Sequence, residues 1–321
     1  MTIVITGAAG FIGSQLSLRL LSKKKKVVGI DNLNNYYSVK LKKYRLKKLE
    51  RFKNFTFIKG DLSKSKGLEI LLKGKKVSDI CHLAAQAGVR YSLTNPEIYI
   101  KCNIDGFLSV LEYCKKYKSA NLVYASSSSV YGGNTKVPFS ISDDVSNPVS
   151  LYAATKRANE LMAQSYSNLF GLSLIGLRFF TVYGPWGRPD MAIWNFTDSK
   201  INNQPIKVFN KGNMSRDFTY IDDIINGIEK ALEYNTQRKN NKHLIFNLGN
   251  NYPVELKKMI SILENIIGKK AKKIMMPMQL GDVKKTYADI SESKKLLGYS
   301  PNTEIREGLS NFVNWYSHYN K

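Results

Sequence analysis

The stretch TIVITGAAGFIGSQLSLRLL, residues 2–21, joins an apolar run to a glycine-rich turn and then to a helical pattern. Gly7 allows the tight turn, Gly10 lets the backbone approach a bound phosphate, and Gly13 lets the helix pack closely on the strand. The free N–H groups and the dipole at the start of the helix favour an anion. The stretch therefore predicts a strand–turn–helix unit that binds a dinucleotide, although a glycine trio alone also occurs in ordinary turns.

Acidic residues after the next two apolar runs strengthen this prediction. Asp31 follows Gly13 by 18 residues, where a carboxylate accepts hydrogen bonds from the adenosine ribose hydroxyls. An acid there repels a 2′-phosphate, so the pattern favours NAD over NADP. Asp61 follows the third run, and a turn after Gly60 explains it equally well. The predicted cofactor-binding residues in this half are Gly7, Gly10, Phe11, Ile12, Gly13, Asp31, Asn32, Asp61 and Leu62.

Short apolar runs alternate with helical patterns through the first half of the chain. This alternation is typical of βαβ units and a parallel sheet. We therefore predict an α/β fold with a Rossmann-type doubly wound parallel sheet. The predicted strands cover residues 2–6, 26–30, 55–59, 79–83, 121–125 and 173–179.

Proline and glycine punctuate shorter elements after Gly184, which predicts a smaller C-terminal α/β substrate domain. We place the Rossmann domain at residues 1–180 and the substrate domain at residues 181–321. Segments from about 218 to 250 are expected to return to the first domain. They are the helix after Ile221 and a strand at residues 244–248.

The 321-residue chain has an ordinary globular balance, with 43% apolar and 23% charged residues, which excludes a disordered or collagen-like chain. Its 49 basic and 25 acidic residues give a net charge of +24, which favours anionic partners. Twelve of the basic residues lie between Lys23 and Lys53. They form either the solvated face of a packed helix or a polyanion-binding patch. The apolar residues interleaved with them favour the helix: Leu41, Tyr44, Leu46 and Leu49.

Cysteine and histidine usage gives no sign of a disulfide framework or a metal site. The three cysteines form no C-x-x-C pair, which is typical of a reducing, cytosolic compartment. The three histidines lie far apart without metal-ligand spacing, and His82 is interpreted as a core residue. We find no signal peptide and no apolar run long enough to span a membrane, so we predict a cytoplasmic protein.

Two motifs bring hydroxyl groups and an acid–base pair to the carboxyl edge of the sheet. The fifth strand runs into SSSS, residues 126–129, which alone is also typical of a polar loop. Tyr152 and Lys156 lie one helical turn apart, so the Lys156 ammonium can lie near the Tyr152 phenol. A nearby cation lowers the pKa of a tyrosine and makes it a better base. Tyr-x-x-x-Lys also occurs on many helix surfaces, and the glycine and serine motifs are what favour the catalytic interpretation.

Together these motifs resemble an extended short-chain dehydrogenase/reductase of the nucleotide-sugar epimerase and dehydratase group. The chain is most similar to the UDP-glucuronate 4-epimerase family, and the resemblance runs from residue 6 to 289. The more specific matches are AAQAGVRYS, residues 84–92, and FFTVYGPWGRPDMA, residues 179–192. Other matches are DNLNNYY, YASSSSVYG, SLYAATKRANE, SRDFTYIDD and QLGDVKKTYAD.

The resemblance implies the roles of the site residues. Tyr152 would be the base and Lys156 its electrostatic partner, and both would also bind the cofactor. Ser127 would be a hydrogen-bond partner of the C4 oxygen. Three arginines would neutralise the diphosphate or a sugar carboxylate, with no assignment between these two tasks. The implied substrate-binding residues are Arg90, Ser128, Ser129, Thr181, Arg188, Arg216 and Asp282.

The reaction implied is NAD-dependent inversion at C4 of a UDP-sugar, UDP-glucuronate to UDP-galacturonate, through a 4-keto intermediate. Related dehydratases and decarboxylases carry acids where this chain has Ser128 and Ser129, and serine is a poor general acid or base without help. The alternatives are a neutral UDP-hexose or UDP-N-acetylhexosamine, a UDP-glucuronate decarboxylase, and an NAD-containing nucleic-acid-binding protein. We expect a homodimer through two helices, residues 97–117 and 152–170, without a metal or a membrane partner.

Overall fold

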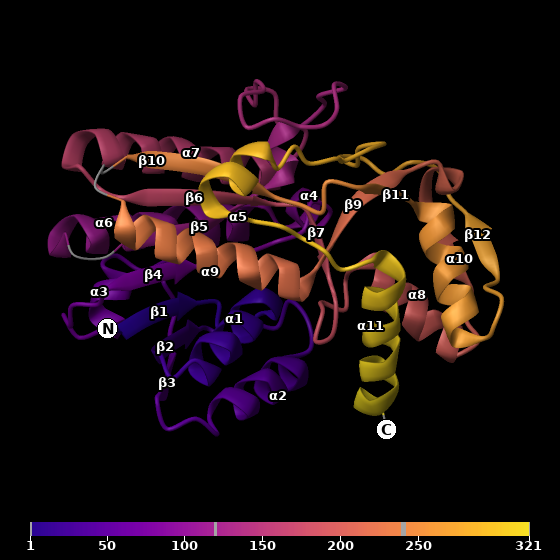
Figure 1. Cartoon of the computed structure of the whole chain (residues 1–321), viewed down its shortest axis with the longest axis horizontal. Coiled ribbons are helices and arrows are strands. Elements are labelled where there is room, and N and C mark those ends of the chain that lie inside the picture. Colours follow the sequence, from indigo (N-terminus) through magenta and orange to yellow (C-terminus); the bar gives the residue numbers. More distant parts are fainter. Residues whose placement is uncertain (1, 119–120, 239–241, 321) are drawn as a thin grey trace.

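Seven parallel strands form the central sheet of the protein, described here from a computed structural model that covers residues 2–118, 121–238 and 242–320. The strand order is β10-β6-β5-β4-β1-β2-β3, which confirms the predicted Rossmann-type topology. Its carboxyl edge faces the C-terminal part of the chain (Figure 1). The strands are β1 (Thr2–Thr6), β2 (Lys26–Asp31), β3 (Phe55–Lys59), β4 (Asp79–His82), β5 (Asn121–Ser127), β6 (Leu174–Phe179) and β10 (His243–Leu248).

Helices cover both faces of this sheet, because each βα crossover returns over one side or the other. One face packs against α1 (Phe11–Ser22), α2 (Val39–Leu49) and α9 (Ile221–Gln237). The other packs against α3 (Gly67–Leu71), α6 (Gly106–Tyr117) and α7 (Leu151–Phe170). The core consequently forms two apolar layers, one on each side of the sheet.

The C-terminal part lies beyond the carboxyl edge, at the right of Figure 1. It has a three-stranded sheet, β11-β9-β7, and a two-stranded sheet, β12-β8. These strands are β7 (Thr181–Tyr183), β8 (Ile206–Val208), β9 (Ser215–Tyr220), β11 (Pro253–Glu255) and β12 (Lys273–Met275). The helices here are α8 (Ala192–Ile201), α10 (Leu256–Ile267) and α11 (Ile305–Tyr319), with short turns η3 (Phe209–Gly212) and η4 (Ser293–Leu297).

The chain returns to the large sheet after β9. Strand β10 pairs with β6 in parallel, from His243 opposite Leu174 to Leu248 opposite Phe179. Helix α9 packs over β5 and against α1. The boundary at residue 180 itself stays a prediction.

Strand β5 continues two residues beyond its predicted end, to Ser127. Ser126 and Ser127 pair with β6 opposite Arg178 and Phe179, so they are strand residues rather than part of a polar loop. The other predicted strands agree with the structure to within one residue at each end.

The helical pattern predicted for residues 97–117 has a π-helical centre. It consists of α5 (Pro96–Tyr99), η1 (Ile100–Asp105) and α6, and it follows the short helix α4 (Tyr91–Thr94). Extra residues of this kind in a helix often mark a functional site. Here the π turn directs Asn103 at Gln86, whose backbone N–H it accepts at 2.8 Å.

Helix α2 is amphipathic as predicted, but one apolar residue is exposed and two basic residues are buried. Leu41, Leu46 and Leu49 are buried, whereas Tyr44 is 40% exposed. Lys42 and Arg45 are buried, contrary to the predicted solvated basic face. Their side chains face the carboxyl edge of the sheet, so the charge of this segment is only partly a surface feature. Within the described ranges, no helix is both long and apolar enough to cross a membrane.

Candidate active site

A cavity of about 920 Å³ lies between the carboxyl edge of the large sheet and the C-terminal part. Such a volume is in the range of cofactor and ligand sites. Every residue that the sequence predicted for the site lines this cavity. From the first half of the chain they are Gly7, Gly10, Phe11, Ile12, Gly13, Asp31, Asn32, Asp61, Leu62, Arg90, Ser127, Ser128, Ser129, Tyr152 and Lys156. From the second half they are Thr181, Arg188, Arg216 and Asp282.

The turn between β1 and α1 accepts only glycine at its critical positions. Gly7 has φ +71°, and its N–H donates to the Ile30 carbonyl at 2.7 Å. A Cβ on Gly13 would lie 2.2 Å from the Gly7 carbonyl oxygen. Gly10 begins α1 without any side-chain cap, so the first N–H groups of the helix are available to an anion at the cavity wall. This cradle fits the diphosphate of a dinucleotide.

Asp31 is fixed at the end of β2 by backbone donors. Its Oδ2 accepts from the Ala9 N–H at 3.1 Å and its Oδ1 from the Leu33 N–H at 2.8 Å. Each oxygen keeps a further lone pair, which is what two ribose hydroxyls require. Asp61 accepts from both the N–H and the hydroxyl of Ser63, so the turn explanation holds for it while it also lines the cavity.

Tyr152 stands in the first turn of α7, which Ser150 caps by accepting the Ala153 N–H at 3.1 Å. Burial in the cavity wall raises the pKa of the Tyr152 phenol above its usual value. A hydrogen bond with Ser127 and the positive charge of Arg188 act in the opposite direction and lower that pKa. Tyr152, Ser127 and Arg188 all line the cavity.

Lys156 is anchored to the sheet at the cavity wall. Its ammonium donates to the Ala125 carbonyl of β5 at 2.8 Å, and its role as the electrostatic partner of Tyr152 stays a prediction. Burial lowers the pKa of Lys156 to about 8, while the nearby Glu160 raises it. The ammonium has three N–H donors, so two remain for a ligand in the cavity that Lys156 lines.

Glu160 fixes helix α7, which carries Tyr152 and Lys156, against the sheet. Its carboxylate is 1% exposed and receives two parallel hydrogen bonds from Arg178 of β6, each of 2.9 Å. Ser126 donates to it at 2.6 Å and Arg157 at 3.0 Å. The hydroxyl of Ser126, a residue of the cavity lining, is therefore engaged by Glu160.

The other serines of this run also line the cavity. Ser127 accepts the Ser129 N–H and donates to the Ser129 hydroxyl, both at 3.2 Å. Ser128 begins the short helix η2 (Ser128–Tyr131) and Thr181 begins β7, both in the cavity lining. Neutral hydroxyls of Ser127, Ser128, Ser129 and Thr181 therefore line the cavity that Tyr152 also lines.

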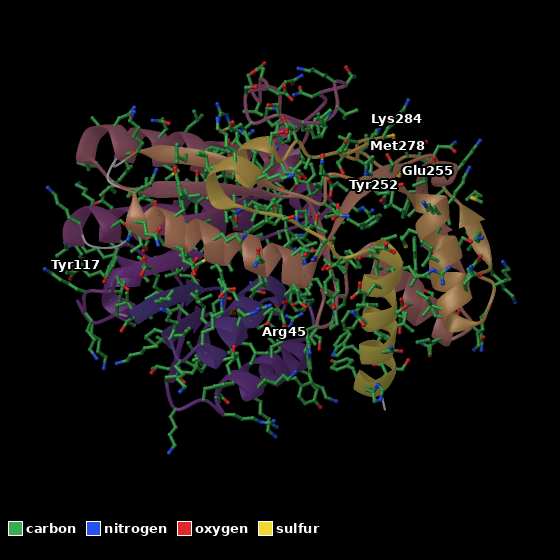
Figure 2. All side chains as sticks on the ribbon, viewed as in Figure 1. Arg45, Tyr117, Tyr252, Glu255, Met278 and Lys284 are labelled. Atoms are coloured by element: carbon green, nitrogen blue, oxygen red, sulfur yellow. The ribbon has the colours of Figure 1, made fainter. Side chains whose placement is uncertain are left out.

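The three predicted arginines fall into two groups. Arg90 and Arg216 lie on either side of Asp282, each with a guanidinium nitrogen 3.8 Å from a carboxylate oxygen. In Figure 2, Lys284, two residues past Asp282, lies beside β9 and β11; its carbonyl accepts from Arg216 at 3.3 Å. Arg188 instead pairs with Asp190, with Nε 3.0 Å from Oδ1. The structure therefore separates the three arginines into two places in the cavity.

Sequence reasoning missed several residues that shape the site. Tyr36 donates to Asp190 at 3.2 Å, and Asp190 in turn holds Arg188. Asn103 joins the loop at Gln86 to Thr155 of α7 by donating to both. Tyr36 and Asp190 lie in the matching stretches DNLNNYY and FFTVYGPWGRPDMA, but spacing alone does not pair residues 154 positions apart.

His82 is a core residue, as interpreted. Thr6 Oγ1 accepts the N–H groups of Leu83 and Ala84, so its own proton goes to His82 Nδ1, 2.8 Å away. Burial, with a smaller effect from Lys156, lowers the pKa of His82 to about 3. The ring is therefore neutral near pH 7.

The sequence model of the NAD dependent epimerase/dehydratase family matches residues 3–249. The chain belongs to this family. The recognised resemblance and the prediction of NAD as cofactor are thereby confirmed, and so is the prediction that the protein is an isomerase of the epimerase type.

Individual members of the epimerase/dehydratase family match nearly the whole chain. UDP-glucuronate 4-epimerase 4 of Arabidopsis thaliana is 47% identical over 99% of this chain and 76% of its own. An uncharacterised protein of Methanocaldococcus jannaschii is 53% identical over 98% of this chain and 95% of its own. The crystal structure of UDP-glucuronic acid 4-epimerase from Bacillus cereus, in complex with UDP-glucuronic acid and NAD, has a TM-score of 0.92 and 36% identity. It covers 99% of this chain and 100% of its own.

A substitution in the glycine-rich turn tests whether this cradle holds NAD. We expect Gly13→Ala to abolish NAD binding, because the added methyl group collides with the Gly7 carbonyl. Gly133→Ala is the matched control, since its Cβ meets only Val149 at 3.7 Å. The measurement is NAD released per chain after denaturation, with circular dichroism to verify folding. Full NAD occupancy in a folded Gly13→Ala protein would contradict this assignment.

Proposed function

We propose that the protein interconverts UDP-glucuronate and UDP-galacturonate by inverting C4 through a 4-keto intermediate. The observation that carries this proposal is a reacting centre of hydroxyls around Tyr152. Four carboxyl groups stand among the described residues that line the cavity: Asp31, Asp61, Asp190 and Asp282. Each already has partners elsewhere, in backbone donors, Ser63 or arginines. That leaves Ser127, Ser128 and Ser129 without an acid that could drive dehydration or decarboxylation.

The proton transfers are assigned to Tyr152 and Ser127. When bound, NAD supplies a reversible hydride acceptor for C4. The Tyr152 phenolate removes the C4 hydroxyl proton, and Ser127 holds the C4 oxygen by a hydrogen bond. After the sugar has turned its other face to the same groups, Tyr152 returns the proton to the C4 oxygen. The positive charge of Arg188 lowers the pKa of Tyr152 and so favours the phenolate, whereas burial raises that pKa.

The arginines have distinct tasks in this proposal. Arg90 and Arg216 suit the diphosphate, because two guanidinium groups converge on one anion position, now facing Asp282. Arg188 suits the sugar end, since its charge reaches Tyr152. Ser128 and Thr181 are proposed to hold the carboxylate in a polar environment, which disfavours loss of CO₂ from a β-keto acid.

The first test is incubation of the purified protein with UDP-glucuronate and no added NAD, followed by chromatography of the nucleotide sugars with CO₂ monitoring. We expect UDP-galacturonate without CO₂, because the cofactor is regenerated in each turnover. Tyr152→Phe, which keeps the ring and removes the acid–base group, should lower the rate by at least 10²-fold. A pentose product with CO₂ would identify a decarboxylase. Faster turnover of UDP-glucose would favour a neutral substrate instead.

The proposed carboxylate pocket has its own test. Thr181→Val preserves the shape of the side chain and removes its hydroxyl, so we expect either higher CO₂ release or weaker UDP-glucuronate binding. Binding is measured by calorimetry and CO₂ by trapping during turnover. Unchanged product and unchanged binding would contradict a contact between Thr181 and the carboxylate.

We further propose a homodimer built from α6 and α7. These helices pack on one face of the sheet, yet Leu108, Leu161 and Leu169 are 41%, 55% and 70% exposed. Apolar side chains that point outward from two adjacent helices suit a second copy of the same surface.

Light scattering after gel filtration tests the dimer. The wild type should have twice the mass of the 36.4 kDa chain. Leu161→Lys should shift it to the monomer, because a charge would be buried against its symmetry mate. Leu280→Lys, at an 81% exposed leucine on the C-terminal part, is the matched control and should leave the mass unchanged. A monomeric wild type would overturn this proposal.

A further inference from the structure

Arg45 of α2 joins three loops that lie far apart in the sequence. Its side chain is buried, with the residue 1% exposed. Nη1 donates to the Ala9 carbonyl at 3.0 Å and to the Tyr37 hydroxyl at 2.7 Å. Nη2 donates to the carbonyls of Trp186 at 2.5 Å and Gly187 at 2.9 Å. In Figure 2, Arg45 lies between the N-terminal helices and the loop beside α11.

These bonds use all four Nη hydrogens, and neutral groups accept all of them. Among the residues that the structure describes, Arg45 forms no salt bridge with a carboxylate, and its Nε has no partner. Burying a cation without a counter-ion lowers the stability of the fold, so the burial of Arg45 is not explained by a stabilising ion pair. The planar guanidinium of Arg45 binds several acceptors in one fixed geometry, which a lysine ammonium cannot do.

One end of this connection is the dinucleotide loop. The Ala9 peptide is fixed on both sides, because its N–H donates to Asp31 and its carbonyl accepts from Arg45. Ala9 lies between Gly7 and Gly10, so its orientation sets the cradle at the start of α1.

The other end is the loop that carries Arg188. Trp186 has φ +65°, a left-handed conformation that is unfavourable for a bulky residue, and Arg45 captures its carbonyl. Arg188 follows two residues later. From the segment between β2 and α2, Tyr36 donates to Asp190, which pairs with Arg188. Tyr36 and Arg45 therefore hold this loop at two points.

We propose that Arg45 is a positioning residue that couples the dinucleotide loop to the orientation of Arg188 at the sugar. It holds the strained Trp186 turn in place and fixes Ala9 at the same time. The coupling to the sugar rests on the proposed function, whereas the coupling to Ala9 does not.

A double-mutant cycle tests the coupling to Arg188. Arg45→Lys keeps the charge and removes the fork, and we expect kcat/KM for UDP-glucuronate to fall roughly 10- to 100-fold. Both backgrounds are assayed with saturating added NAD, so that weaker NAD binding does not contribute to the loss. In an Arg188→Gln background, the same change should then cost less than about threefold, because the remaining loss acts through Arg188. Arg51→Lys, an exposed arginine just after α2, is the matched control and should leave kcat/KM unchanged. Equal losses in both backgrounds would overturn the proposal.

NAD content tests the other end without any turnover. After gel filtration, Arg45→Lys should retain several-fold less NAD than the wild type, whereas Arg188→Gln should retain the full amount. Retention of full NAD by a folded Arg45→Lys protein would overturn the coupling to Ala9. Should Arg45→Lys not fold, Tyr37→Phe removes one of the four acceptors of Arg45. This substitution should also lower both NAD content and kcat/KM. Wild-type turnover is measured first, so a failure of the proposed function is seen there and not confused with a failure of this proposal.

Discussion

The buried ion pair between Glu160 and Arg178 fixes the geometry on which the reacting centre depends. Arg178 belongs to the sheet and Glu160 to α7, so their two parallel hydrogen bonds set the height and rotation of the helix on the sheet. Tyr152 lies two turns before Glu160 and Lys156 one turn before it. Removing one partner of a buried pair leaves an uncompensated charge, which typically costs about 3–5 kcal/mol. Tyr152, the proposed acid–base group, is thus held by an ion pair whose two residues are not among those that line the cavity.

The parts of the fold that follow from periodicity and glycine spacing could be predicted from the sequence. The strands of the large sheet appear where apolar runs alternate with helical patterns, and Asp31 ends β2 as its distance from Gly13 indicated. The same reasoning could not place Lys42 and Arg45. Both are basic residues in a lysine-rich helix, and only the packing of α2 against the carboxyl edge turns them inward.

Side-chain direction was the other limit of sequence reasoning. Helical spacing places Tyr152 and Lys156 on one face, yet Lys156 donates to the Ala125 carbonyl because the end of β5 lies beneath it. The π-helical turn at Ile100–Asp105 has no sequence signature of its own, and it is what brings Asn103 to Gln86. Likewise, the grouping of the arginines arises from two aspartates, Asp282 and Asp190, contributed by separate loops.

The Ala9 peptide, anchored at both its N–H and its carbonyl, has a consequence for the entropy of binding. A flexible glycine-rich loop must lose conformational freedom when it closes on a ligand, and that loss weakens the complex. Here Asp31 and Arg45 have already ordered the peptide, so little freedom remains to be lost. Such preorganisation favours slow dissociation of NAD. Slow dissociation suits the proposed reaction, in which NAD is regenerated in each turnover and does not need to exchange.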